Sequence, residues 1–171
     1  MPDNDLIARL AQQIDAAKRA ERFLVNAEDV AALRRRGASE LHAICAEFAA
    51  SVNNKLGGVE LELSPPEFGP DTYQETVVNL LQLGFQGRVM QIAFEAPAGL
   101  FSTDKFLIPY VLEGEIRTFN QRMLERLEVR SQMLFYCVEG ETATWRFFDW
   151  RTMQTGPLGR DLLATLMGRL F

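Results

Sequence analysis

The chain has few residues that could act as nucleophiles or bind metals. His42 is the only histidine, and Cys45 follows three residues later in a helical pattern, so the two side chains can meet on one helix face. They could form a Cys–His pair, but no oxyanion-hole loop or third orienting group lies nearby in the sequence. We therefore favour a half-buried histidine beside a packed cysteine.

The two cysteines, Cys45 and Cys137, both lie among apolar residues. Without a secretion signal, this context is typical of buried free thiols rather than of a disulfide. One histidine and two separated cysteines do not make a closed zinc site within one chain. The sequence therefore predicts no metal and no other cofactor.

Paired carboxylates are the remaining route to acid–base catalysis. Glu60 and Glu62 share one face of an expected strand and could neighbour Glu95 or Glu115 in space. Exposed strand faces are usually charged, however, and the sequence contains no GxxxxGK[ST], GxGxxG, GxSxG or HExxH motif. These observations favour a protein that is not an enzyme.

An aromatic segment at 145–150 is the clearest candidate for a binding surface. Trp145, Phe147 and Asp149 alternate onto one face of the expected strand, and Trp150 lies on the other. The functional hypothesis is a ligand or partner surface built with two further aromatic residues, Phe94 and Tyr110. The structural alternative, which we favour, is burial on both faces, with Asp149 paired to Arg151 or Arg117.

The charge is unevenly distributed along the chain. The net charge is −5, with eight basic and eight acidic residues in 1–56 but ten and fifteen in 57–171. Six cations flank the junction of the first two helices and could contact phosphates or an acidic partner: Lys18, Arg19, Arg22, Arg34, Arg35 and Arg36. We favour a solvated face. The acidic balance argues against nucleic acid as a partner, because such binding draws on net basic charge.

The N-terminal third has the periodicity of two helices. The segment 5–24 places apolar residues three and four positions apart, and a second stripe continues over 27–55. Gly37 falls on that second stripe without breaking its phase, which favours one long helix. The alternative is a break there, with Ser39 capping a separate helix. Gly57 and Gly58 end the helical half.

After Gly58 the periodicity changes to that of strands. We expect strands at 59–63, 77–85, 88–95, 106–112, 115–120, 129–138 and 142–153, with turns at 86–87, 113–114 and 139–141. Pro109 suggests an edge strand or a bulge. A final helix is expected after Thr155 or Gly156 as its cap, with Pro157 in its first turn.

Together these elements predict an α+β fold. It comprises two N-terminal helices, the second of them long, a curved and mostly antiparallel sheet of about six strands, and a C-terminal helix. We expect a single domain over 1–171, divided into a helical half at 1–56, the sheet at 57–154 and the last helix at 155–171. This layout is similar to that of small secretion chaperones and of several ligand-binding folds in which a long helix rests on a curved sheet, a likeness of fold that transfers no residue roles.

These features favour a non-enzymatic interaction or binding module that forms a homo-oligomer, expected to be a dimer, since apolar residues occupy both faces of 129–153. The alternative is a small-molecule pocket between the sheet and the long helix, lined by Trp145, Phe147, Phe94 and Tyr110. The sequence contains no run of eighteen apolar residues, so we expect no membrane span. The acidic N-terminus lacks the features of a signal peptide, so the expected location is the cytoplasm.

Overall fold

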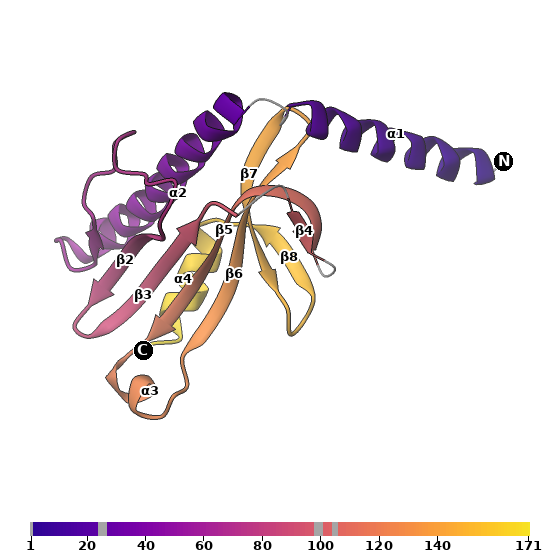
Figure 1. The fold of residues 1–171 in the computed structure, drawn as a ribbon. Helices are drawn as coiled ribbons and strands as arrows, with labels where there is room; N and C mark the ends of the chain where they lie inside the picture. The colour runs from indigo at the N-terminus through magenta and orange to yellow at the C-terminus, as the bar shows by residue number, and fades with distance from the viewer. Residues whose placement is uncertain (1, 24–26, 98–100, 104–105) are drawn as a thin grey trace.

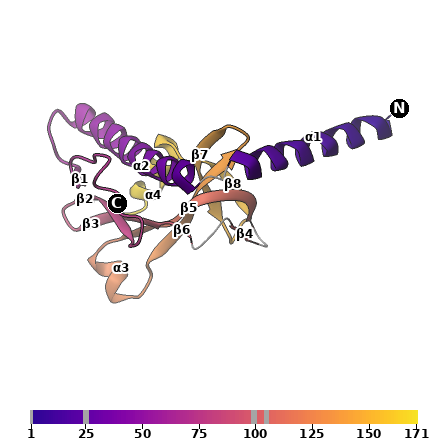
Figure 2. The same cartoon turned by 45° about the horizontal axis from the view of Figure 1, so that its top comes forward.

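The computed structural model describes the backbone of residues 2–23, 27–97, 101–103 and 106–171, and the side chains of 5–18, 29–97 and 109–171. It contains two long N-terminal helices, α1 (Pro2–Phe23) and α2 (Ala27–Leu56). Helix α2 lies on the sheet, whereas α1 points away from the rest of the molecule (Figures 1 and 2).

The long helix α2 is continuous through Gly37, so the predicted single helix is confirmed and the alternative break at Ser39 is wrong. Its apolar stripe, which includes Leu33, Leu41 and Phe48, is buried against the sheet. An ideal Cβ at Gly37 would lie 2.6 Å from the ring of Tyr136. Glycine therefore allows the helix to pass closely over the sheet.

The strands form one antiparallel sheet with the order β1-β2-β3-β5-β6-β7-β8, and a further short strand, β4, pairs with β5. The strands are β1 (Glu62–Ser64), β2 (Asn79–Phe85), β3 (Arg88–Glu95), β4 (Phe101–Thr103), β5 (Phe106–Phe119), β6 (Arg130–Glu139), β7 (Thr142–Asp149) and β8 (Gln154–Pro157). The α+β class is confirmed, with eight strands among the described residues where about six were expected.

Two short helices complete the fold. Helix α3 (Gln121–Glu125) connects β5 to β6, and Asn120 caps it by accepting a hydrogen bond from the backbone N–H of Met123 at 2.9 Å. Helix α4 (Arg160–Gly168) follows the last strand, and its Leu163, Leu166 and Met167 enter the same core as α2.

The predicted turn at 113–114 is wrong, because β5 runs without interruption from Phe106 to Phe119. Gly114 pairs with Phe94 on one side and with Leu134 on the other. A Cβ at this position would lie 2.6 Å from the carbonyl oxygen of Ala93. The glycine thus serves a close approach between strands rather than a turn. The register does shift between Tyr110 and Leu112, just after Pro109.

The end of the sheet and the start of the last helix also differ from the prediction. The strand predicted over 142–153 ends at Asp149, and residues 154–157 form β8 instead of the cap and first turn of the last helix. That helix begins at Arg160, with Gly159 as its N-cap. Pro157 is tolerated in β8 because β8 is an edge strand, where one row of backbone groups needs no strand partner.

The predicted hairpin turns at 86–87 and 139–141 are confirmed. Gln86 and Gly87 both have positive φ, 46° and 80°, which matches the two-residue turn favoured between twisted strands. Gly140 has φ 66° in the turn between β6 and β7. Both turns depend on local backbone chemistry and were therefore visible in the sequence.

The two faces of the sheet have different surroundings. One, the covered face, packs against α2 and α4 and contributes most of the hydrophobic core. The other, the open face, carries the alternate residues of the central strands, including Glu113, Glu115, Met133 and Phe135. Candidate binding residues on this second face are not separated from solvent by either helix.

Candidate functional site

The predicted aromatic residues are divided between the two faces of the sheet. Trp145 and Phe94 lie on the covered face, 3% and 1% exposed, with their rings edge to face at 6.0 Å. The indole Nε1 of Trp145 donates a hydrogen bond to the backbone oxygen of Gly37 at 2.7 Å. Phe147 is partly buried against the same core. These side chains therefore fill the space between the sheet and the long helix, where the alternative hypothesis placed a small-molecule pocket.

Tyr110 lies on the opposite side of the sheet, within a separate buried cluster with Phe135, Cys137 and Phe148. The rings of Tyr110 and Phe135 are 4.6 Å apart. The structure therefore does not bring Tyr110 together with Trp145.

Asp149 and Trp150 lie at the end of β7. A carboxylate oxygen of Asp149 accepts a hydrogen bond from the backbone N–H of Arg151 at 2.9 Å, whereas Arg117 forms its ion pair with Glu115 at 3.1 Å. Trp150 is half exposed, and the guanidinium of Arg151 lies 5.4 Å from its ring centroid. Trp150 is thus the predicted aromatic residue with the most surface available to a partner.

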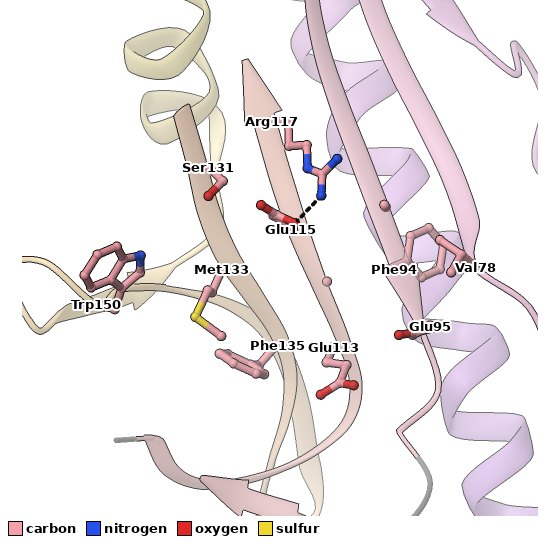
Figure 3. Close-up of a pocket in the computed structure, with 12 residues that line it drawn as sticks. Val78, Phe94, Glu95, Glu113, Glu115, Arg117, Ser131, Met133, Phe135 and Trp150 are labelled. Carbon is pink, nitrogen blue, oxygen red and sulfur yellow. Dashed lines mark hydrogen bonds and ion pairs between the residues drawn. The ribbon is translucent and has the colours of Figure 1, made fainter. Parts of the chain in front are cut away.

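A groove of about 670 Å³ crosses the open face (Figure 3). Its apolar part includes Val78, Met133, Phe135 and Trp150, and its polar part includes three glutamates with Arg117. Figure 3 shows Glu113 and Glu95 on neighbouring strands, away from the ion pair of Glu115.

The register of β3 and β5 places Glu95 directly opposite Glu113. Burial raises the pKa of Glu113, the charge of Glu95 raises it further, and a hydrogen bond with the hydroxyl of Tyr110 lowers it. Two carboxylates at one cross-strand position repel each other when both are ionised. The pair would therefore gain from a cation bound between them.

The sequence analysis considered different carboxylates, Glu60 and Glu62, and favoured a charged strand face without catalysis. Glu62 lies in β1, opposite Gly84 of β2, so a whole strand separates it from Glu95 in β3. Glu60 and Glu62 instead line a surface depression at the turn of the β2–β3 hairpin. Glu113 was missed because its neighbour Gly114 resembled a turn residue. The alternation of 113, 115 and 117 in one long strand was the signal that could have found it.

Two of the six residues of the predicted basic cluster, Arg34 and Arg36, are engaged in structural contacts. Arg34 donates a hydrogen bond to the backbone oxygen of Val111 at 3.0 Å and forms an ion pair with Glu75. Arg36 pairs with Glu40 at 3.1 Å. Arg35 is exposed on α2, and Lys18 is exposed on α1. The side chains of Arg19 and Arg22 lie outside the described residues.

His42, Cys45 and Cys137 are packed within the fold rather than arranged as a reactive site. Nε2 of His42 lies 2.8 Å from the backbone oxygen of Pro65, and its ring stacks on Phe68 at 5.5 Å. Cys45 and Cys137 are buried and free, as predicted, and burial raises the pKa of each thiol to about 12. Both thiols stay protonated at neutral pH, which makes them poor nucleophiles.

Helix α1 carries an exposed apolar surface that the sequence analysis did not propose as a site. Every described side chain of α1, residues 5–18, is exposed. We call Leu6, Ile7, Leu10 and Ile14 the α1 stripe; these four side chains are 49% to 66% exposed. The spacing of the stripe was visible in the sequence, but its lack of a covering partner was not.

Among the described residues, no group of three or more His, Cys, Asp or Glu side chains is arranged to hold a metal ion. None of the described helices combines the length and the apolar character needed to cross a bilayer. No family model, curated protein or solved structure matches this chain. Its function must therefore be argued from its own surfaces.

Proposed function

We propose that the chain is a protein-interaction module that pairs with a second copy of itself through α1. The observation that carries this proposal is the exposure of the α1 stripe on a helix that points away from the body (Figures 1 and 2). Monomeric proteins rarely leave such contiguous apolar surface in water. Most of the stability of a helix in a protein comes from the packing of its apolar face, so α1 would gain stability from a partner.

The spacing within α1 suits pairing with another helix. Ile7, Leu10, Ile14 and Ala17 follow one another at intervals of three, four and three residues. This is the apolar repeat of helices that pack side by side in coiled coils. An identical stripe on a second copy supplies a matching surface, and such a two-fold contact closes on itself.

The charges of α1 favour an antiparallel pair. Asp5 lies near one end of the helix and Lys18 near the other. Antiparallel pairing places the end that carries Asp5 beside the end of the partner helix that carries Lys18. Parallel pairing would instead set like charges side by side, which is destabilising.

Sedimentation velocity at micromolar concentration tests the proposal. We expect the wild-type chain to sediment as a dimer and Leu10→Glu to sediment as a 19.3 kDa monomer. Leu80→Glu is the matched control, because Leu80 is a comparably exposed leucine on β2. A monomeric wild type over a hundredfold dilution range, or a dimer that survives Leu10→Glu, would contradict the proposal.

A charge-reversal pair tests the antiparallel arrangement separately. Lys18→Glu should weaken the dimer, and Asp5→Lys in the same chain should restore it, because the two positions then exchange their signs. In a parallel pair the second change would bring no recovery. The readout is the dimer dissociation constant at low salt, where exposed charge pairs have their largest effect.

The open-face groove supports a second candidate function, the binding of a small cationic ligand with an apolar part. The specific observation is the Glu95–Glu113 pair beside Met133 and Phe135 in a groove of about 670 Å³, a volume typical of ligand sites. Calorimetric titration with 1,6-diaminohexane tests it. Binding should be lost in Glu113→Gln and retained in Glu62→Gln, a glutamate outside the groove; no binding to the wild type would rule out this cation.

A further inference from the structure

Five arginines line a single pocket of about 610 Å³ at the end of the sheet that carries α3. They come from four separate segments: Arg122 and Arg126 from α3 and its C-cap, Arg130 from the start of β6, Arg151 from the turn after β7, and Arg169 from the end of α4. Their convergence is therefore a product of the tertiary fold.

The described residues do not balance the charges in this arginine pocket. Among those that line it, Glu128 is the only acidic one. Within the described part of the chain, none of the five arginines forms an ion pair, whereas Arg9, Arg34, Arg36 and Arg117 each have a carboxylate partner. Five cations around one pocket repel one another. A bound anion would relieve this repulsion.

The residue type indicates which anion fits. A guanidinium group presents a planar fork of N–H donors that matches the oxygens of a phosphate group, and several such forks around one pocket can bind adjacent phosphates. The volume is that of a small-molecule site. The net charge of −5 disfavours a long nucleic acid, whose binding would bring many phosphates near the acidic remainder of the chain.

Apolar side chains accompany the arginines. Leu127 is 91% exposed and lines the pocket with Val129, and Leu124 is exposed beside them. Leu127 also has a positive φ of 55°, a backbone conformation that is unfavourable for leucine. Exposed apolar groups beside clustered arginines are compatible with either a soluble phosphate ligand or the head group of a lipid.

We propose that the arginine pocket binds a small polyanion that carries two or more phosphate groups, either free or as a lipid head group. The five guanidinium groups hold the phosphates, and Asn120 at the edge of the pocket offers a further polar group. This site is independent of α1, so its occupation does not require the proposed dimer.

Two probes distinguish the sources of the phosphate. The first is inorganic tripolyphosphate, followed by calorimetry, and the second is a vesicle of phosphatidylcholine and cardiolipin, whose head group carries two phosphates, in a 7:3 ratio, with pure phosphatidylcholine vesicles for comparison. Binding of tripolyphosphate alone assigns the site to a soluble ligand. Binding of the anionic vesicles alone assigns it to a lipid head group, and binding of both supports the shared chemistry.

Matched double variants separate the pocket from the general charge of the protein. Arg126→Gln with Arg151→Gln removes two pocket cations, and Arg35→Gln with Arg160→Gln removes two exposed cations elsewhere. We expect the pocket variant to bind roughly tenfold more weakly or worse, because charge-assisted hydrogen bonds are lost. The control should change by less than about twofold. Circular dichroism confirms that both variants fold.

Two results would overturn this proposal. One is that neither probe binds the wild-type chain at low ionic strength. The other is an equal loss of binding in the pocket and control variants, which would show that only the overall charge matters. Neither result depends on the oligomeric state.

Discussion

Helices α1 and α2 are neighbours in the chain and both carry an apolar stripe, but their stripes have different surroundings. In α2 the stripe lies against the sheet, and Leu41 and Cys45 are fully buried. In α1 the stripe is exposed along the whole described length. The comparison shows that amphipathic spacing predicts a need for a covering surface without identifying the chain that provides it.

Truncating one leucine in each helix should give the largest contrast. Leu41→Ala removes a fully buried side chain and should lower the free energy of unfolding by about 2–5 kcal/mol. Leu10→Ala should change it by no more than about 0.5 kcal/mol in dilute protein, where α1 has no partner. Urea unfolding measures both values. A cost of several kcal/mol for Leu10→Ala in the monomer would mean that α1 packs on its own body.

The contact of α2 with the sheet should also be sensitive to a single methyl group. Gly37→Ala places a Cβ 2.6 Å from the ring of Tyr136, which packs against Trp145 at 5.2 Å and has little freedom to move. We expect a loss of about 1–3 kcal/mol through overpacking, larger than the gain in helix propensity.

Gly58→Ala is the control for this methyl group, because no atom lies within 4 Å of its added Cβ. Its free energy of unfolding should stay near that of the wild type. If Gly37→Ala instead proves stabilising, the close crossing of helix and sheet is wrong.

The pH dependence of stability under alkaline conditions should reveal the burial of Cys45 in the α2 stripe. Burial raises the pKa of this thiol from 9.0 to about 12. Between these values the unfolded chain loses the proton and the folded chain keeps it, so stability falls as the pH rises. We expect Cys45 to contribute a loss of about 1–2 kcal/mol between pH 9 and pH 10.5.

The measurement is the free energy of unfolding at the two pH values, in the wild type and in Cys45→Ala. The variant should lose less stability over this range. A Leu10→Cys substitution in α1 adds an exposed thiol that titrates alike in both states, so it should leave the slope unchanged. Identical slopes for wild type and Cys45→Ala would contradict the assigned burial.

Exposed ion pairs on the polar sides of the two helices should contribute similarly small amounts to stability. These are the smallest effects that we expect. Arg9 pairs with Asp5 on α1 at 3.8 Å, and Arg36 pairs with Glu40 on α2 at 3.1 Å, both four residues apart and solvent-exposed. Arg9→Gln and Arg36→Gln should each cost about 0.2–0.5 kcal/mol in the monomer. Thermal melts at low and high salt check this. A much larger cost in either helix would show that the difference extends beyond the apolar stripes.

Features determined by neighbouring residues were predictable from the sequence. The turn at Gln86 and Gly87, the long stripe of α2 and the buried thiols follow from local patterns, and the structure has all three. Gly114 shows where local patterns mislead. Glycine after glutamate resembles a turn, but here it admits the carbonyl of Ala93 from a neighbouring strand. That contact depends on the register between strands, which single-residue propensities do not contain.

The candidate sites were harder to predict because they combine distant segments. Glu95 and Glu113 meet only once the register of β3 and β5 is known. In the arginine pocket, the four-residue spacing of Arg122, Arg126 and Arg130 was visible in the sequence, but the approach of Arg151 and Arg169 was not. The exposed α1 stripe was likewise beyond prediction, since its spacing equals that of a buried helix.

The ends of the sheet limit how copies of this chain can assemble. The edge strands β1, β4 and β8 are three, three and four residues long, and β8 ends in Pro157, which has no N–H to donate. Such short edges give an incoming strand little to add to, and this discourages growth of sheets from molecule to molecule into fibrils. Because the sheet ends are protected in this way, copies that pair through the exposed helix α1, as proposed, would form a complex of limited size.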